Sequence, residues 1–70
     1  VNIHYDANGG IGNMPDDVNV EFGNAVAANN AFSRSYYDFV GWNNIYENTV
    51  YQPGDSFSLD GSIRFVAMWK

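Results

Sequence analysis

Cysteine is absent from this chain of 70 residues, and positive charge is scarce. Without cysteine the fold has neither disulfide bonds nor thiolate metal ligands. The only cations are Arg34, Arg64 and Lys70, and the formal net charge is −5. Nucleic acids and anionic membranes bind clustered lysine and arginine, so this composition argues against both as partners. No apolar run approaches the ~20 residues of a membrane span, so membrane insertion is not expected.

Aromatic residues make up 17% of the chain, and their burial is expected to stabilise the fold in place of disulfide bonds. A chain of this length lies near the lower limit for independent folding, so we expect a single domain over residues 1–70. Each buried aromatic side chain removes roughly 150–250 Å² from water. Trp42, Trp69 and their neighbours must therefore form most of a small core.

Alternating apolar and polar residues predict a strand over residues 1–6 and a second over 18–22 that ends at Gly23. Asn8, Gly9 and Gly10 tolerate positive φ, so the chain is expected to turn there. The two strands are too far apart for a tight turn, which predicts a hairpin with a long, glycine-rich loop.

Residues 24–35 are too short and too rich in asparagine for a full helix. The expected structure is a single turn, or an extended linker whose Phe32 side chain is inserted into the core. A third strand is predicted over 36–42. Both of its faces are apolar, which indicates a strand covered on both sides or a bulge near Gly41 that re-aims Trp42.

The remaining residues predict a polar loop and two short strands. Asn43, Asn44 and Asn48 mark the loop, and Pro53-Gly54 is a turn signature. A short edge segment contains Phe57 and Leu59. The last strand covers residues 63–69, with four residues on its inner face: Ile63, Phe65, Ala67 and Trp69. The residues expected to form the structural core are Tyr5, Phe39, Gly41, Trp42, Phe65, Ala67 and Trp69; those expected to form turns are Asn8, Gly9, Gly10, Pro53 and Gly54.

Three motifs together resemble one known family. They are Tyr5–Gly10, Phe39–Trp42 and Ala67–Trp69, in the right order and spacing. The chain is similar over its whole length to the Listeria–Bacteroides repeat, also called the B-repeat of internalins. It departs from the family pattern where Ser35 or Tyr36 replaces a glycine before the central motif, and where Phe65-Val66 replaces Leu-Tyr.

The resemblance implies an α+β, strand-dominated fold: a small β-grasp-like, mostly antiparallel sheet in which the helix is reduced or absent. It also implies a non-catalytic repeat module of a bacterial cell-surface protein, extracellular, acting as a spacer and a protein-interaction or adhesion domain. The partners it implies are neighbouring repeats and a protein of unknown identity. It brings no catalytic residue, and the residues themselves lead us to expect no cofactor and no metal.

Few residues suggest chemistry. His4 is the lone imidazole and lacks the partner that a general base or metal ligand needs, so a structural role is expected. The segment 6–10 begins like a calcium loop, but Gly10, Ile11 and Asp17 stand where that loop needs an oxygen ligand, a glycine and a glutamate. We therefore expect Asp6 or Asn8 to cap its own backbone.

The other polar groups have equally plain interpretations. Asp16, Asp17 and Glu21 are expected to keep an exposed strand soluble rather than to bind a cation. The serines lie in no nucleophile motif with a histidine and an acid behind it, so an enzyme is not expected.

Several apolar residues exceed what one compact face needs: Tyr36, Tyr46, Tyr51, Val66 and Met68. Packing is expected for Tyr36 and Tyr51, whereas a neighbouring repeat is an equally good cover for Val66 and Met68. Two alternative functions remain open. One is a carbohydrate-binding module that uses exposed aromatic rings, and the other is a ubiquitin-like intracellular adaptor.

Overall fold

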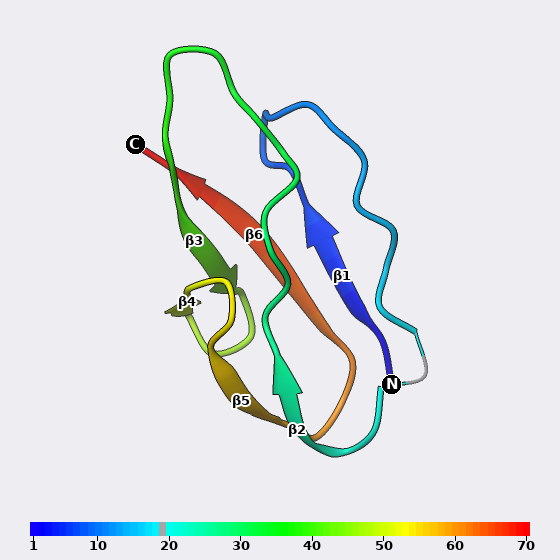
Figure 1. Cartoon of the computed structure of the whole chain (residues 1–70). Helices are drawn as coiled ribbons and strands as arrows, with labels where there is room; N and C mark the ends of the chain where they lie inside the picture. The colour runs from blue at the N-terminus through cyan, green and yellow to red at the C-terminus, as the bar shows by residue number, and fades with distance from the viewer. Residues whose placement is uncertain (19) are drawn as a thin grey trace.

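The computed structural model describes residues 1–18 and 20–70. Six strands occur in these residues, and no helix: β1 (Ile3–Asp6), β2 (Gly23–Val26), β3 (Phe39–Asn44), β4 (Thr49–Tyr51), β5 (Ser56–Leu59) and β6 (Ile63–Trp69) (Figure 1). β1, β6, β3 and β4 form a four-stranded sheet in that order, and β2 pairs with β5 in a second sheet. β1 runs parallel to β6, and the other pairs are antiparallel. The expected strand-dominated fold is therefore confirmed as a mixed sheet and a small antiparallel one.

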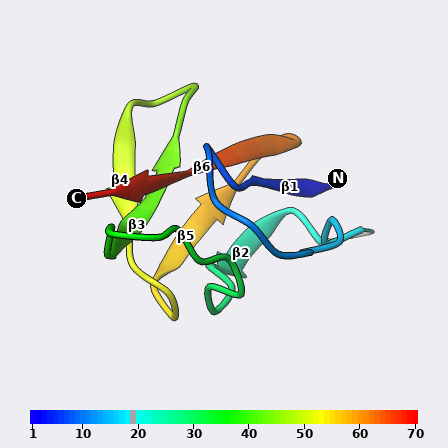
Figure 2. The ribbon, with the colours of Figure 1, turned by 90° about the horizontal axis from the view of Figure 1, so that it is seen from above.

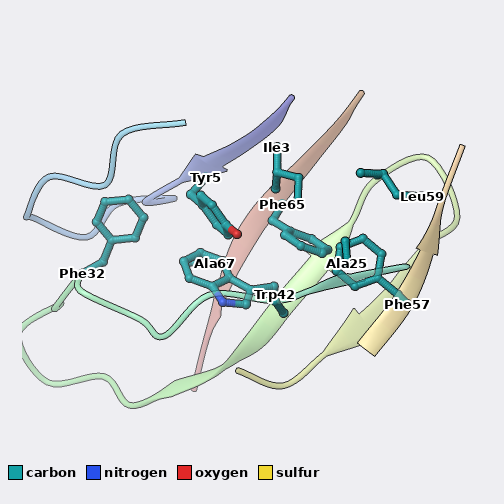
Figure 3. Close-up of a cluster of buried hydrophobic side chains, with 10 residues drawn as sticks. Ile3, Tyr5, Ala25, Phe32, Trp42, Phe57, Leu59, Phe65 and Ala67 are labelled. Atoms are coloured by element: carbon teal, nitrogen blue, oxygen red, sulfur yellow. The ribbon is translucent and has the colours of Figure 1, made fainter. Parts of the chain in front are cut away.

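The hydrophobic core lies between the two sheets, whose strands are seen from above in Figure 2 and whose buried side chains are drawn in Figure 3. Alternation along the strands of the large sheet sends one set of side chains toward β2 and β5. Trp42, Phe65 and Ala67 have no exposed surface at all. The large sheet contributes Ile3, Tyr5, Trp42, Phe65 and Ala67, and the opposite layer contributes Ala25, Ala27, Phe32, Phe57 and Leu59.

A β-bulge in β3 places two aromatic residues on the same face. The register against β6 shifts between Phe39, which pairs with Trp69, and Gly41, which pairs with Met68. The rings of Phe39 and Trp42 consequently meet edge to face, with centroids 4.9 Å apart. A Cβ atom on Gly41 would lie 2.7 Å from Cγ1 of Val50, so only glycine fits here. The predicted bulge near Gly41 is confirmed.

The predicted hairpin of the first two strands is wrong. Asn19 lies outside the described residues, and the flanking residues form no strand before β2 begins at Gly23. Val18 and Phe22 are 60% and 70% exposed, so their alternation reflects no buried face. Asp17 instead makes an isolated antiparallel bridge to Ile3. The partner of β1 in the sheet is β6, at the other end of the sequence.

The third strand begins later than predicted. Tyr36 has a φ of 71° and is fully exposed, and an extended strand does not accommodate this backbone angle. The strand then continues through Asn43 and Asn44, which were predicted to be a loop. β4 was not predicted as a strand; it pairs with β3 as a hairpin strand.

Residues 27–35 form the extended linker foreseen as one alternative, and Phe32 is buried. The backbone groups of this linker form hydrogen bonds with other segments of the chain rather than with one another. The amide of Ala27 donates to the carbonyl of Asp55, 2.9 Å away, and Ile11 and Ser33 form an isolated bridge. These bonds satisfy the backbone without helix formation.

Candidate functional site

The first turn of the chain is joined to the last strand. Asn8 donates from Nδ2 to the carbonyl of Ala67 at 2.9 Å, and the indole Nε1 of Trp69 donates to the carbonyl of Ala7 at 2.9 Å. A Cβ atom on Gly10 would lie 2.7 Å from Cζ2 of Trp69, so the ring packs directly over this glycine. Asn8 and Gly9 have φ angles of 48° and 91°, as a turn-forming pair requires.

The carboxylate of Asp6 is engaged within the protein. Oδ1 accepts the amide of Asn8 at 2.8 Å, which forms an Asx turn, and Oδ2 accepts Nη2 of Arg64 at 3.2 Å. Among the residues that the structure describes, no group of three or more His, Cys, Asp or Glu side chains could hold a metal ion. The local capping role expected for Asp6 is what the geometry shows.

The two tryptophans occupy different environments. Trp42 is completely buried, and its Nε1 donates to the carbonyl of Ala28 at 2.9 Å. Trp69 is partly buried and packs against the edge of the core, where its ring meets that of Phe39 at 5.8 Å. Neither indole lines the cavity between the β3–β4 turn and the β5–β6 loop.

Tyr5 connects three parts of the chain through its hydroxyl. It donates to Oδ2 of Asp17 at 2.8 Å and accepts the amide of Ala28 at 3.3 Å. Burial, and then the neighbouring carboxylate of Asp17, raise the pKa of Tyr5 well above its ordinary value of 10.0. This phenol is therefore a structural hydrogen-bond donor and is poorly suited to act as a base.

His4 and the acidic residues near it lie at the surface. Nδ1 of His4 is 2.7 Å from Oδ1 of Asp16, and both side chains are more than 40% exposed. Asp17 binds Tyr5 and bridges Ile3. The acidic residues 16 and 17 thus cover the outer edge of β1, as expected for charges beside an exposed strand.

A shallow cavity of about 330 Å³ lies where the β3–β4 turn meets the β5–β6 loop. Tyr46, which is 69% exposed, and Glu47 line one side, and Ser58, Asp60 and Ser62 line the other. By contrast, the ring of Tyr51 packs on Phe57 and Phe65. Tyr46 and Tyr51 therefore do not present a pair of solvent-facing rings.

The face of the four-stranded sheet that points away from the core carries a mixture of polar and apolar side chains. We call this the outer face and define it by six residues that share it through cross-strand pairing: His4, Asn43, Val50, Arg64, Val66 and Met68. Val66 and Met68 are partly buried. Oδ1 of Asn43 is shielded from solvent and accepts no hydrogen bond from the described part of the chain.

Asn44 is a structural residue that the sequence prediction missed. It is 2% exposed, its Oδ1 accepts the amide of Tyr46 at 3.0 Å, and its Nδ2 donates to Oε1 of Glu47 at 2.8 Å. The amide of Asn48, at a φ of 55°, closes the same turn by donating to the carbonyl of Asn44. The paired asparagines signal a turn correctly but do not reveal that one of them is buried.

Residues 2–68 match the Listeria-Bacteroides repeat domain. The chain belongs to this family. No curated protein matches the chain, and neither does any solved structure.

Members of the Listeria–Bacteroides repeat family are typical of bacterial surface proteins and are generally non-catalytic. Within the described residues no helix is long and apolar enough to cross a membrane.

Proposed function

We propose that this Listeria–Bacteroides repeat domain is an extracellular, non-catalytic spacer that separates other parts of a bacterial surface protein. The observation that carries the proposal is the placement of the chain ends. β1 and β6 are parallel neighbours, so the chain enters at one end of the sheet and leaves at the other (Figure 1). A unit with a longest dimension of 36 Å therefore adds length when copies follow one another.

The arrangement supports a β-grasp-like description of this spacer. The first and last strands pair in parallel, with β1 at one edge of the four-stranded sheet and β6 inside it, and β3 continues the sheet antiparallel to β6. Residues 27–35 pass across the inner face of this sheet, where they place Phe32 in the core (Figures 1 and 3). We infer that this segment replaces the helix that would otherwise cover the face.

The surface chemistry supports a role without catalysis. The single imidazole is tied to Asp16 at an exposed edge rather than held in a desolvated cavity beside a nucleophile. The outer face is the surface proposed for contacts with neighbouring repeats or with a protein partner. Its exposed Val50 and partly buried Val66 and Met68 offer apolar area for such contacts.

Small-angle scattering from proteins with one, two and three tandem copies tests the spacer role. We expect the maximum dimension to grow with each copy by a length close to the 36 Å axis of one unit. A three-copy protein no longer than the two-copy protein would show that the repeats fold back on each other, and the spacer role would be wrong.

One observation supports carbohydrate binding as a second candidate. The exposed ring of Tyr46 stands beside Glu47, Asp60 and the serine hydroxyls of the cavity, and sugars bind to such combinations of an aromatic face and polar groups. Titration with cell-wall glycans, followed by Tyr46 chemical shifts, tests it. Binding that is lost in Tyr46→Ala and kept in Tyr36→Ala would support this candidate, and no shift at millimolar glycan would remove it.

A further inference from the structure

The pairing of β1 with β6 determines how the domain experiences tension. Ile3–Asp6 lie parallel to Ile63–Val66, and the open end of each strand leads to the chain on either side of the module. A pull on the two chain ends therefore draws β1 and β6 in opposite directions along their own axes. The hydrogen bonds between them run across this direction.

This geometry loads many bonds at once. When neighbouring strands slide past each other, every cross-strand bond of the pair must break before either strand is released. When a pair is instead opened from one end, its bonds break one after another. Resistance to forced unfolding depends on the barrier to the first such event, so the sliding geometry is the stronger one.

Additional contacts extend the bonded region beyond the four paired residues on each strand. Before β1, the backbone carbonyl of Asn2 accepts a hydrogen bond from the amide of Ile63 at 3.1 Å. The backbone amide of Asn2 donates to Oγ of Ser62 at 3.0 Å. After β1, the bonds from Asn8 to Ala67 and from Trp69 to Ala7 continue the connection through partly buried atoms.

Both loaded strands are also held on their other edges. Ile3 exchanges two backbone hydrogen bonds with Asp17, at 2.8 and 2.9 Å, and the amide of Val20 donates to the carbonyl of Val1 at 2.9 Å. β6 is paired along its far edge with β3. Neither strand is a free edge that a pull can peel away from the domain.

We propose that the β1–β6 pair is a mechanical clamp, a shear-loaded element that lets the module carry tension between the parts of the protein it separates. The inference rests on the proposed spacer function, because tension reaches the domain only through its flanking chain. It adds a property that spacing alone does not require: resistance that depends on the direction of the pull.

Single-molecule pulling in two directions tests the clamp. The first direction uses handles at both chain ends. The second uses the C-terminal handle and a thiol at Tyr36→Cys, which is a unique attachment site in a cysteine-free chain and is fully exposed. That second pull opens the β3–β6 pair from its end, beginning with the two bonds of 3.0 Å between Asp38 and Lys70.

At equal pulling speed we expect the end-to-end unfolding force to be at least about twofold higher than the force in the second direction. Equal forces, or a weaker end-to-end direction, would overturn the clamp. Extended tandem copies in scattering experiments would then still support the spacer, so the two proposals fail separately.

A pair of matched variants isolates the side-chain contribution. Asn8→Gly removes the bond to Ala67, and Asn48→Gly makes the same change in the β3–β4 turn; glycine suits both positions because their φ angles are 48° and 55°. We expect the end-to-end force to fall in Asn8→Gly and to stay at the wild-type value in Asn48→Gly. An equal fall in both variants would show that the bond from Asn8 bears no load.

Discussion

The rings of Tyr5 and Trp42 meet edge to face with centroids 4.9 Å apart, and their polar atoms bind the two backbone groups of one residue. The hydroxyl of Tyr5 accepts the amide of Ala28, and Nε1 of Trp42 donates to its carbonyl. The contact ties β1 and β3 of the large sheet to the linker that crosses it. A buried aromatic pair with both polar atoms satisfied combines apolar burial with a defined geometry.

Replacing Trp42 is expected to unfold the domain. Trp42→Ala removes a fully buried ring and its hydrogen bond, at a cost of about 3–5 kcal/mol. A domain of this size has only a few kcal/mol of stability, so the variant should be largely unfolded. Trp69→Ala, at a partly buried position, should cost less. Urea denaturation followed by circular dichroism measures both, and a Trp42→Ala midpoint near the wild-type value would contradict this core assignment.

Gly10 is expected to tolerate no side chain. A Cβ atom there would lie 2.7 Å from Cζ2 of Trp69 and 3.0 Å from the carbonyl oxygen of Ser33. Gly10→Ala should destabilise the fold by about 1–3 kcal/mol, since close-packed atoms must move apart. Gly61→Ala is the matched control, because nothing lies within 4 Å of a Cβ atom at that position. Thermal unfolding of the two variants should differ clearly, and equal midpoints would refute the packing of Trp69 on this turn.

The pH dependence of stability should report the buried phenol. The folded state raises the pKa of Tyr5 by burial and by the carboxylate of Asp17, so it holds the proton more tightly than the unfolded chain. The resulting stabilisation is fully present below the ordinary pKa of about 10 and is lost as pH rises through the raised value. Unfolding free energy should therefore fall above pH ~10, and less steeply in Tyr5→Phe. Identical slopes for the two proteins would show that Tyr5 is not the group responsible.

Calcium is expected to leave the melting temperature unchanged. Both carboxylate oxygens of Asp6 already accept hydrogen bonds, one from Asn8 and one from Arg64. A ligand that binds only the folded state raises its stability, so calorimetry with millimolar calcium and with chelator compares the two conditions directly. A rise of several degrees in calcium would reveal a cation site at this turn.

Local patterns predicted those parts of the fold in which alternation and burial coincide. β6 is such a case, because Phe65 and Ala67 face the core in the expected alternation. The Pro53-Gly54 turn is another: Gly54 has a φ of 89°, and the amide of Asp55 donates to the carbonyl of Gln52.

Other features depend on partners that local patterns do not contain. Val18 and Phe22 alternate like strand residues but remain exposed. The chain near them forms only a few backbone hydrogen bonds with the first residues, those between Ile3 and Asp17 and from Val20 to Val1. The parallel pairing of β1 with β6 joins residues about as far apart as the chain allows. Asn44 resembles a loop residue, and only its hydrogen bonds explain why it is buried.

The parallel register of the first and last strands is the feature on which the spacer and the clamp both depend. Cross-strand nuclear Overhauser effects in the isotope-labelled protein measure it directly. Contacts that join Tyr5 to the Phe65 region and advance in the same direction along both strands are the predicted result. A pattern that pairs residues 1–6 with 18–22 as an antiparallel hairpin, without contacts to residues 63–66, would contradict the account.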